Sequence, residues 1–294
     1  MTNPQDQPLV SVIISSYNHA DYIEACIESV MAQTYPNVEL LVVDDGSRDD
    51  SVARLRQLQA KYGFDFRVQE NKGLSHTLNE TIARSKGSLI APFGSDDIMV
   101  PERLAIQVAY LADKPEVGIC AGNVESIDAN GRVRSKQKLR PARRLDFDDI
   151  FLDRKPGAPA PTMLFRREAI EVVGGYDPEI RLEDLLMKLK ITRAGYVIDV
   201  LEDVLAQYRT HDHNTYKNLG FMIEHVMKTY AIFKDHPAYE EVCARFINSM
   251  LMKCARDDKP LARQLFARVS WRHWNGKTLR AVGRFLLPSR AASK

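Results

Sequence analysis

The chain has 294 residues, of which 45% are hydrophobic and 27% charged, and its formal net charge is +2. These values are typical of a folded protein, and the nearly balanced charge argues against nucleic acid as the main partner. The sequence contains no signal-peptide pattern, no membrane-spanning run of roughly 18 apolar residues and no C-x-x-C pair, so we expect a cytoplasmic protein with reduced thiols.

The first hundred residues alternate between apolar segments of strand length and amphipathic segments of helical length. The expected strands are 10–14, 38–43, 64–69 and 88–93, and the expected helices are 20–33, 50–61 and 75–85. This alternation predicts a parallel sheet with helices on both faces. In open sheets of this kind ligands bind at the carboxyl ends of the strands, so the polar residues that follow each strand are the candidate site.

Tyr17 follows the first expected strand, and Asp44 and Asp45 follow the second. A dinucleotide site would place G-x-G-x-x-G after the first strand, and the sequence has no such pattern there. A tyrosine can stack on a flat base, and a carboxylate can accept hydrogen bonds from a base N–H or from ribose hydroxyls. The sequence therefore predicts a nucleotide held by its base and ribose.

Gly94-Ser95-Asp96-Asp97 follows the strand at 88–93. A divalent cation with oxygen ligands needs a carboxylate at a fixed strand end, where a diphosphate can complete the coordination. The same aspartates could instead cap the helix expected from Pro101 to Leu111. With Asp45 at a neighbouring strand end, the pattern favours a site.

Past residue 100 the alternation loosens. Strands are expected at 117–124, 161–165, 197–200 and 204–208, a long connection or mobile flap at 132–160, a helix at 183–194, and only helices from 216 onward. We therefore expect a first domain over residues 1–215, followed by a helical, basic region over 216–294. Within the first domain, a nucleotide half would span about 8–125 and an acceptor half about 126–215.

Four residues of the second half have two interpretations each. Glu183 and Asp184 begin an amphipathic helix, where the helix dipole favours acidic residues, but one of them could face a cleft as a general base. Arg209 could clamp a phosphate and His211 could bind a metal, although both could be ordinary surface residues.

The end of the chain is basic. Residues 255–294 hold ten Lys and Arg against two Asp, interleaved with Trp, Leu, Val and Phe. This is the composition of a segment that lies at a membrane interface, although it also fits a solvated helical face. It predicts peripheral contact with the inner membrane through residues 255–294.

Taken together and in order, seven segments resemble glycosyltransferase family 2, the inverting glycosyltransferases with the GT-A fold, and especially the bacterial enzymes that build lipopolysaccharide, O-antigen and other surface polysaccharides. These segments are 10–17, 40–47, 71–79, 87–101, 165–177, 183–189 and 208–211. The resemblance covers about residues 8–215 and implies an α/β, doubly wound, mostly parallel sheet with a Rossmann-like N-terminal half, followed by a C-terminal helical tail.

The resemblance also implies site residues. On the nucleotide side these are Ser15, Tyr17, Asp45, Asn71, Lys72, Ser95 and Arg209. Asp184 would be the catalytic base with Glu183 as its companion, and Asp96 and His211 would bind the metal. Gly174, Gly175, Tyr176 and Asp177 resemble the acceptor-side loop. One departure stands out, because Gly94 replaces the first aspartate of the usual D-x-D motif.

The implied reaction uses a UDP- or dTDP-sugar, with rhamnose as a first guess, and Mg²⁺ or Mn²⁺ to neutralise the diphosphate. Asp184 would take the proton of an acceptor hydroxyl as it attacks the anomeric carbon from the opposite face. The acceptor would be a glycan or glycolipid at the cytoplasmic face of the inner membrane. Two alternatives stay open, a nucleotide-sugar-binding protein without turnover and a nucleotidyltransferase. The latter would need a Gly-rich basic loop where residues 15–18 stand.

Overall fold

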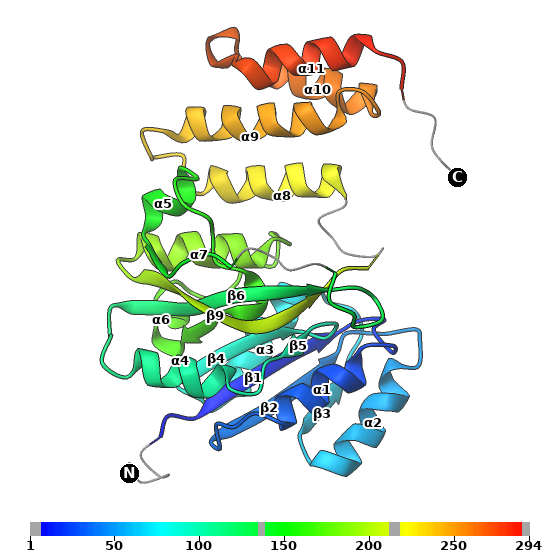
Figure 1. The fold of residues 1–294 in the computed structure, drawn as a ribbon, viewed down its shortest axis with the longest axis vertical. Helices are drawn as coiled ribbons and strands as arrows, with labels where there is room; N and C mark the ends of the chain where they lie inside the picture. The colour runs from blue at the N-terminus through cyan, green and yellow to red at the C-terminus, as the bar shows by residue number, and fades with distance from the viewer. Residues whose placement is uncertain (1–6, 135–138, 212–217, 290–294) are drawn as a thin grey trace. The chain divides into compact units, whose positions relative to one another are not determined.

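The computed structural model describes residues 7–134, 139–211 and 218–289. The chain divides into two compact units, Met1–Asp212 and His213–Lys294, and each is described by itself. Figure 1 shows strands and helices in the first unit and helices in the second. No helix within the described ranges is long and apolar enough to cross a membrane.

The first half of the first unit is the expected parallel α/β arrangement. Its strands are β1 (Val10–Ser16), β2 (Val38–Asp44), β3 (Asp65–Val68) and β4 (Leu89–Gly94), and its helices are α1 (Ile23–Met31), α2 (Ser51–Tyr62) and α3 (Leu74–Arg84). β1 lies between β2 and β4 and is parallel to both, and β3 pairs with the outer side of β2. The register places Ser15 beside Val43 and Gly94, so the polar residues that follow these strands meet at one edge.

The second half makes the sheet mixed. β8 (Leu164–Arg166) is antiparallel to β4 and to β6 (Val117–Ile127), and β9 (Val197–Arg209) is parallel to β6. β5 (Ile98–Met99) and β7 (Arg143–Leu145) both pair antiparallel with β9. The strand order is β3-β2-β1-β4-β8-β6-β9-β5, with β7 paired to β9 off this path.

Two expectations for this half were wrong. The sequence predicts separate strands at 197–200 and 204–208, but β9 is continuous, because the register against β6 shifts around Asn123 and absorbs the polar interruption. Residues 132–160 are also not a featureless connection where the structure describes them. They contain β7 and α5 (Phe147–Phe151), which begins with a capping box between Asp146 and Asp149.

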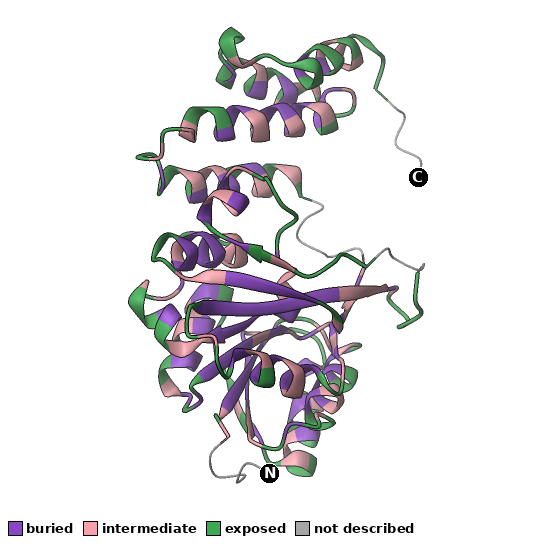
Figure 2. Cartoon of the chain, turned by 60° about the vertical axis from the view of Figure 1, so that its left-hand side comes forward, coloured by how far each residue is buried: buried purple, intermediate pink, exposed green. Residues whose placement is uncertain are grey.

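The remaining elements of this unit cover the sheet. They are α4 (Arg103–Leu111), the 3₁₀ turn η2 (Ala160–Thr162), α6 (Arg167–Val172) and α7 (Glu183–Arg193). Alternate residues of β1 face opposite sides, so Val12 and Ile14 belong to one hydrophobic cluster and Ile13 to the other. Figure 2 shows the central strands as mostly buried.

The second unit consists of packed helices. They are α8 (Leu219–Ala231), α9 (Tyr239–Cys254), α10 (Lys259–Arg268), the 3₁₀ turn η4 (Trp271–His273) and α11 (Gly276–Leu286). Its own core includes Leu251 of α9, Leu265 of α10 and Ala281 of α11, all of them almost fully buried. Asn275 caps α11 through a capping box with Thr278, which fixes where that helix begins. All four cysteines of the chain are buried and free of disulfides.

Candidate functional site

The turns after β1 and β2 are tied to each other at the carboxyl edge of the sheet. The backbone N–H of Asn18 donates to Ser47 Oγ at 2.8 Å, and the N–H of Arg48 donates to Asn18 Oδ1 at 2.8 Å. Asn18 needs a left-handed backbone, with φ of 54°, to make this connection. Two predicted nucleotide-side residues lie just before Asn18. Ser15 is half-buried, whereas Tyr17 is 44% exposed, so the Tyr17 ring is accessible to a ligand.

Asp45 organises the turn that precedes α3. Its Oδ1 accepts from Gln69 Nε2 at 2.7 Å and from the backbone N–H of Lys72 at 2.9 Å, and its Oδ2 accepts from the N–H of Gly73 at 2.9 Å. Asn71 Nδ2 donates to the Asp45 carbonyl at 2.9 Å. An ionised carboxylate accepts about four hydrogen bonds, so these three leave room for one from a ligand. Direct contact with a base remains a prediction.

Lys72 lies on the surface of this turn. Its Nζ is 3.2 Å from Glu80 Oε1, and both side chains are nearly half exposed. Exposed ion pairs of this kind contribute at most about 1 kcal/mol, so Lys72 can exchange Glu80 for a phosphate at little cost.

Asp96, His211 and His19 form a cluster at the end of β4. Their candidate ligand atoms all lie within 4.8 Å of one another, and His211 Nε2 is 2.9 Å from Asp96 Oδ2. His19 Nδ1 is 2.7 Å from the hydroxyl of Ser95, a buried residue. Asp96 and His211 are thus together as predicted, whereas His19 was missed. The signal for it is a histidine two residues after Tyr17, at the same sheet edge.

Arg209 is buried next to this cluster and binds the backbone that carries it. The residue is 4% exposed, and its guanidinium donates to the carbonyls of Asp96, Asp128 and Ala129 at 2.7, 3.2 and 3.1 Å. Its backbone N–H donates to Asp97 Oδ1 at 2.9 Å. These contacts fit a positioning role, and the predicted phosphate contact of Arg209 remains a prediction.

Asp97 differs from Asp96 in its surroundings. Burial and the charge of Asp96 raise the pKa of Asp97 well above its ordinary value. Asp97 is therefore part of the buried support, and Asp96 is the carboxylate that meets the histidines.

The candidate base lies in the first turn of α7. Asp184 Oδ2 is 2.8 Å from Lys188 Nζ, one helical turn later, and that Nζ also donates to the Ala158 carbonyl at 3.3 Å. Burial raises the pKa of Asp184, but the charge and hydrogen bond of Lys188, together with backbone hydrogen bonds, outweigh it and hold that pKa below its ordinary value. Burial and the charge of Asp184 raise the pKa of Glu183 to about 8. At neutral pH, Asp184 is therefore the ionised member of the pair.

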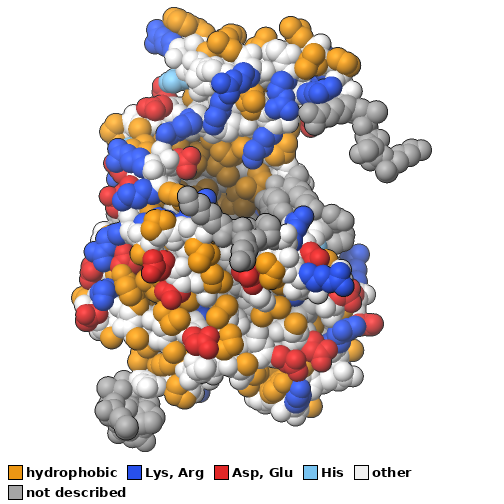
Figure 3. Space-filling model, viewed as in Figure 1, with side chains coloured by type: hydrophobic (Ala, Val, Ile, Leu, Met, Phe, Trp, Pro, Cys, Tyr) orange, Lys and Arg blue, Asp and Glu red, His pale blue; other side chains and the backbone are white. Residues whose placement is uncertain are grey.

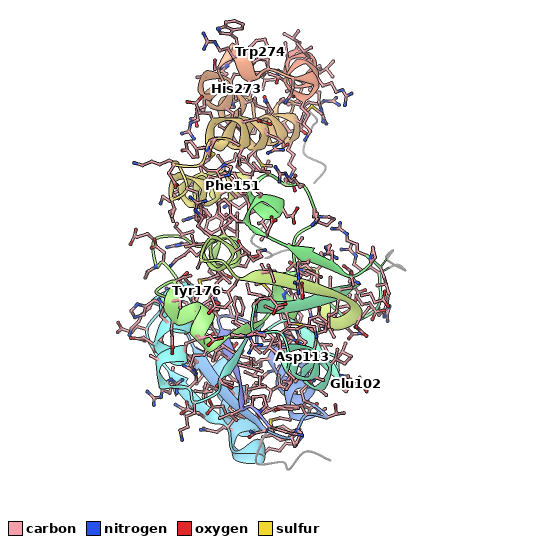
Figure 4. The ribbon with its side chains drawn as sticks, turned by 90° about the vertical axis from the view of Figure 1, so that its left-hand side faces the viewer. Glu102, Asp113, Phe151, Tyr176, His273 and Trp274 are labelled. Carbon is pink, nitrogen blue, oxygen red and sulfur yellow. The ribbon has the colours of Figure 1, made fainter. Side chains whose placement is uncertain are left out.

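The loop from Gly174 to Asp177 is fixed between α3 and α7. Asn79 of α3 accepts from the N–H of Tyr176 at 2.9 Å and donates to its carbonyl at 2.8 Å, and Lys190 Nζ of α7 donates to the Gly175 carbonyl at 2.7 Å. Tyr176, labelled in Figure 4, is 4% exposed, so its ring belongs to the core. Burial and the charges of Glu183 and Asp184 raise the pKa of its hydroxyl, so this hydroxyl is within electrostatic range of the candidate base.

A cavity of about 520 Å³ lies elsewhere, at the amino ends of β1 and β4, lined among others by Pro8, Leu89 and Arg166. The guanidinium of Arg166 donates hydrogen bonds to the carbonyls of Leu111, Lys114 and Val117, so it is already engaged by the protein itself. None of the residues predicted for the site lines this cavity, so we place the site at the carboxyl edge.

Comparison with known proteins agrees with this geometry. The chain is 28% identical over 219 residues to the amylovoran biosynthesis glycosyltransferase AmsE of Erwinia amylovora, covering 72% of this chain and 80% of that one. It is 28% identical over 220 residues to the O-antigen biosynthesis glycosyltransferase WbnJ of Escherichia coli, covering 71% of this chain and 83% of that one.

Two solved structures share the fold at 18% identity. S. aureus TarS, in complex with UDP-GlcNAc, superposes with a TM-score of 0.66 over 94% of this chain and 80% of that one. The mannosyltransferase PcManGT of Pyrobaculum calidifontis, in complex with GDP-Man and Mn²⁺, superposes with a TM-score of 0.62 over 97% of this chain and 89% of that one. Both support a GT-A fold for this chain.

The family model described as glycosyl transferase family 2 matches residues 11–174, which is more than half of the chain and includes β1 to α6. The chain therefore belongs to glycosyltransferase family 2 and is a glycosyltransferase of EC class 2.4.

Proposed function

We propose that this glycosyltransferase moves a sugar from a UDP- or dTDP-sugar, with rhamnose the first to test, to a hydroxyl of an acceptor glycan with inversion, and that Asp184 is the general base. The observation that carries this proposal is that the pKa values of the two neighbouring carboxyl groups, Asp184 and Glu183, are shifted in opposite directions. Lys188 keeps Asp184 ionised, while burial raises the pKa of Glu183 to about 8. A base that works at neutral pH must be deprotonated before it meets its substrate.

On the donor side, the accessible ring of Tyr17 and the turn held by Asp45 form the proposed nucleotide site. Asn71 and Lys72 lie on that turn, where a nucleotide phosphate would replace Glu80 beside Lys72. TarS binds UDP-GlcNAc and PcManGT binds GDP-Man, so proteins with this fold accept both kinds of base, and the pyrimidine is proposed here from the resemblance to bacterial surface-polysaccharide enzymes.

Asp96 and His211 would hold a divalent cation, for which Mg²⁺ and Mn²⁺ are the candidates. The donor set fits, because a half-buried carboxylate and an imidazole already approach to 2.9 Å and Arg209 fixes the backbone beneath them. When bound, the cation would offset the charge of the leaving diphosphate. The Mn²⁺ bound by PcManGT supports this assignment.

The residues of the chain itself supply the remaining chemistry. Asp184 accepts the proton of the acceptor hydroxyl as its oxygen attacks the anomeric carbon opposite the leaving diphosphate, so one displacement inverts that carbon. Lys188 orients the carboxylate. The loop from Gly174 to Asp177 is held by Lys190 to α7, the helix that carries Asp184, and is the proposed acceptor side.

The test is turnover with a panel of UDP- and dTDP-sugars and candidate acceptors, read as release of the nucleoside diphosphate and as the anomeric configuration of the product by NMR. We expect release with at least one donor and an inverted product. Donor binding without any release across the panel would instead support a binding protein, and release of pyrophosphate from a nucleoside triphosphate would support a nucleotidyltransferase.

For the acceptor, we propose a bacterial cell-surface glycan carried on a lipid, as the functions of AmsE and WbnJ suggest. Such an acceptor is found at a membrane, and the second unit offers a surface that would reach one. Trp271, Trp274, Leu279 and Leu286 are 75%, 47%, 64% and 78% exposed. Figure 4 shows Trp274 and His273 in the segment between α10 and α11.

Cations accompany these apolar side chains. On α11, Leu279 and Leu286 are seven residues apart and share one face, and Arg280 lies on the adjoining exposed face. Figure 3 shows Lys and Arg side chains interspersed with hydrophobic ones over the C-terminal helices. Exposed tryptophan and leucine beside cations fit the interface of an anionic membrane, where each cation contributes about 1 kcal/mol. Phe285, in contrast, packs against Phe266 and is not part of this surface.

Vesicle sedimentation tests this docking surface. Deleting residues 255–294 would uncover the core around Leu251, so point variants of the full chain are the sharper tool. We expect binding to anionic vesicles that weakens with salt and is lost in a Trp271→Ser, Leu286→Ser double variant. Ile232→Ser, which replaces a side chain 46% exposed in the same unit, is the matched control. Equal pelleting of the double variant and the control would exclude this surface.

A further inference from the structure

We propose that His19 is a third metal ligand, so that this chain binds its cation with two imidazoles and one carboxylate rather than with the two aspartates of the usual D-x-D motif. The inference deepens the proposed function, because it rests on a metal bound by Asp96 and His211. Nothing in the sequence motif itself assigns His19, which lies in the turn after β1 and 77 positions before Asp96.

The positions of the three side chains carry the proposal. Their candidate ligand atoms lie within 4.8 Å of one another. Two ligands of the same ion are separated by at most twice a metal–ligand distance, which is about 4–5 Å. The rings of His19 and His211 are 5.7 Å apart and steeply inclined, at 79°, so they do not stack against each other and both can approach one point.

Gly94 removes one carboxylate ligand of the usual motif, and in this proposal His19 supplies a ligand in its place. The first aspartate of the motif would stand at this position, but a Cβ placed on Gly94 would lie 2.9 Å from Asp96 Oδ1 and 3.0 Å from Asp97 Oδ2. The two following carboxylates fold back over the glycine and occupy the space of the missing side chain. A side chain at position 94 would have to displace these two carboxylates, and His19 approaches from the neighbouring strand end instead.

The surroundings of His19 are those of an oriented ligand. Its Nδ1 is 2.7 Å from Ser95 Oγ, and in the tautomer in which Nδ1 donates, Nε2 carries the lone pair that a metal requires. Tyr22 contacts both histidines, edge-on to His19 at 5.9 Å and stacked with His211 at 5.2 Å. The guanidinium of Arg209 lies 4.9 Å from the centre of the Tyr22 ring. These contacts restrict both imidazoles before any ion arrives.

Two imidazoles change which ion the site selects. Mg²⁺ prefers oxygen ligands, whereas imidazole nitrogen favours first-row transition ions. We therefore expect the site formed by His19, Asp96 and His211 to bind Mn²⁺ more tightly than Mg²⁺. We expect Co²⁺ to bind as well.

The test uses Mn²⁺ alone with the full-length protein, free of nucleotide. EPR of free Mn²⁺ gives the affinity, and pulsed EPR of the bound ion counts coordinated imidazoles. We expect two imidazoles in the wild type and one in His19→Gln, with an affinity lower by at least about tenfold, since even the loss of an outer partner typically costs 10–100-fold. His273→Gln, in the second unit, is the control and should keep both.

The wild-type count does not depend on any variant, so a misfolded His19→Gln would leave the proposal testable. One coordinated imidazole in the wild type, or equal Mn²⁺ affinity for His19→Gln and His273→Gln, would overturn the role of His19 while leaving Asp96 and His211 in place. No Mn²⁺ binding at all would overturn the metal site as well. Donor turnover in EDTA, measured separately, shows whether the transfer proposal stands in that case.

Discussion

At Asp184, a lysine one helical turn away decides which of two adjacent carboxyl groups carries the negative charge. The charge and the 2.8 Å hydrogen bond of Lys188 Nζ, together with backbone hydrogen bonds, outweigh burial and hold the pKa of Asp184 below its ordinary value. For Glu183, burial and the charge of Asp184 prevail and raise its pKa to about 8. The division of roles between the two neighbours thus comes from a third residue.

This relation predicts the effect of Lys188→Met. A base acts in its ionised form, so activity falls as the pH drops through its pKa. Without Lys188, Asp184 loses the charge and the side-chain hydrogen bond that lower its pKa, so this pKa rises, and we expect the acidic limb of kcat/KM to move toward neutral pH. Activity at pH 5 should therefore fall more than activity at pH 8. The matched control is Lys228→Met, which breaks an exposed ion pair of the same spacing, with Glu224 on α8.

If the acidic limb of kcat/KM stayed at the same pH in Lys188→Met as in the wild type, this account would be contradicted. An acidic limb near pH 8 in the wild type would assign the base to Glu183 instead, because that is where its pKa lies.

The sequence predicted part of the site at this scale. Asp96, His211 and Asp184 follow strand or helix boundaries within motifs, and those boundaries were readable. His19 and Lys188 were not identified, because their roles depend on distances across the fold. His19 lies far from Asp96 along the chain, and Lys188 looks like an ordinary cation in an amphipathic helix. The burial of Arg209 was not predictable either, because it depends on hydrogen bonds to loop carbonyls that leave no pattern in the sequence.

At the scale of the elements, the carboxylate of Asp45 strengthens the connection between two loops, which Asn71 also makes through the Asp45 carbonyl. Its carboxylate accepts from two consecutive backbone N–H groups, those of Lys72 and Gly73, at the start of α3. Gly46 beside it has a φ of 81°, and a Cβ there would lie 2.9 Å from the Asn71 nitrogen. The close approach of the two loops therefore needs both residues.

We expect Asp45→Ala to destabilise the protein by about 2–4 kcal/mol, because hydrogen bonds to a charged group contribute about 1.5–3 kcal/mol each and are not additive. Donor affinity should fall as well, since the loop carries Asn71 and Lys72. Chemical denaturation and calorimetry with UDP measure the two effects. Asp50→Ala, on an exposed residue that makes no side-chain cap to α2, should change stability little.

The sheet shows where sequence patterns succeed and where they stop. β1, β2 and β4 were predictable because each is a largely apolar run followed by a polar turn, and β3 because its residues alternate between polar and apolar. β5 has only two residues, and α5 only five, so neither shows a period. β9 was divided in two because Glu202 and Asp203 interrupt its apolar pattern, yet Asn123 Nδ2 donates to the Glu202 carbonyl at 2.8 Å and keeps the strand paired.

At the scale of the whole molecule, the two units carry different parts of the proposed activity. The first unit holds the residues of the proposed transfer reaction, and its family membership rests on residues 11–174. The second has its own core and exposes tryptophan and leucine side chains beside cations. We therefore expect the vesicle-binding variants of the second unit to retain turnover of a soluble donor and acceptor.

The most direct test of the central claim is the turnover number of Asp184→Asn at saturating donor and acceptor, with donor affinity measured in parallel. Asparagine keeps the size of the side chain but cannot accept the proton, so we predict a fall in kcat of roughly 10²–10⁴-fold with donor affinity nearly unchanged. A variant that turns over within a few-fold of the wild-type rate would contradict Asp184 as the base.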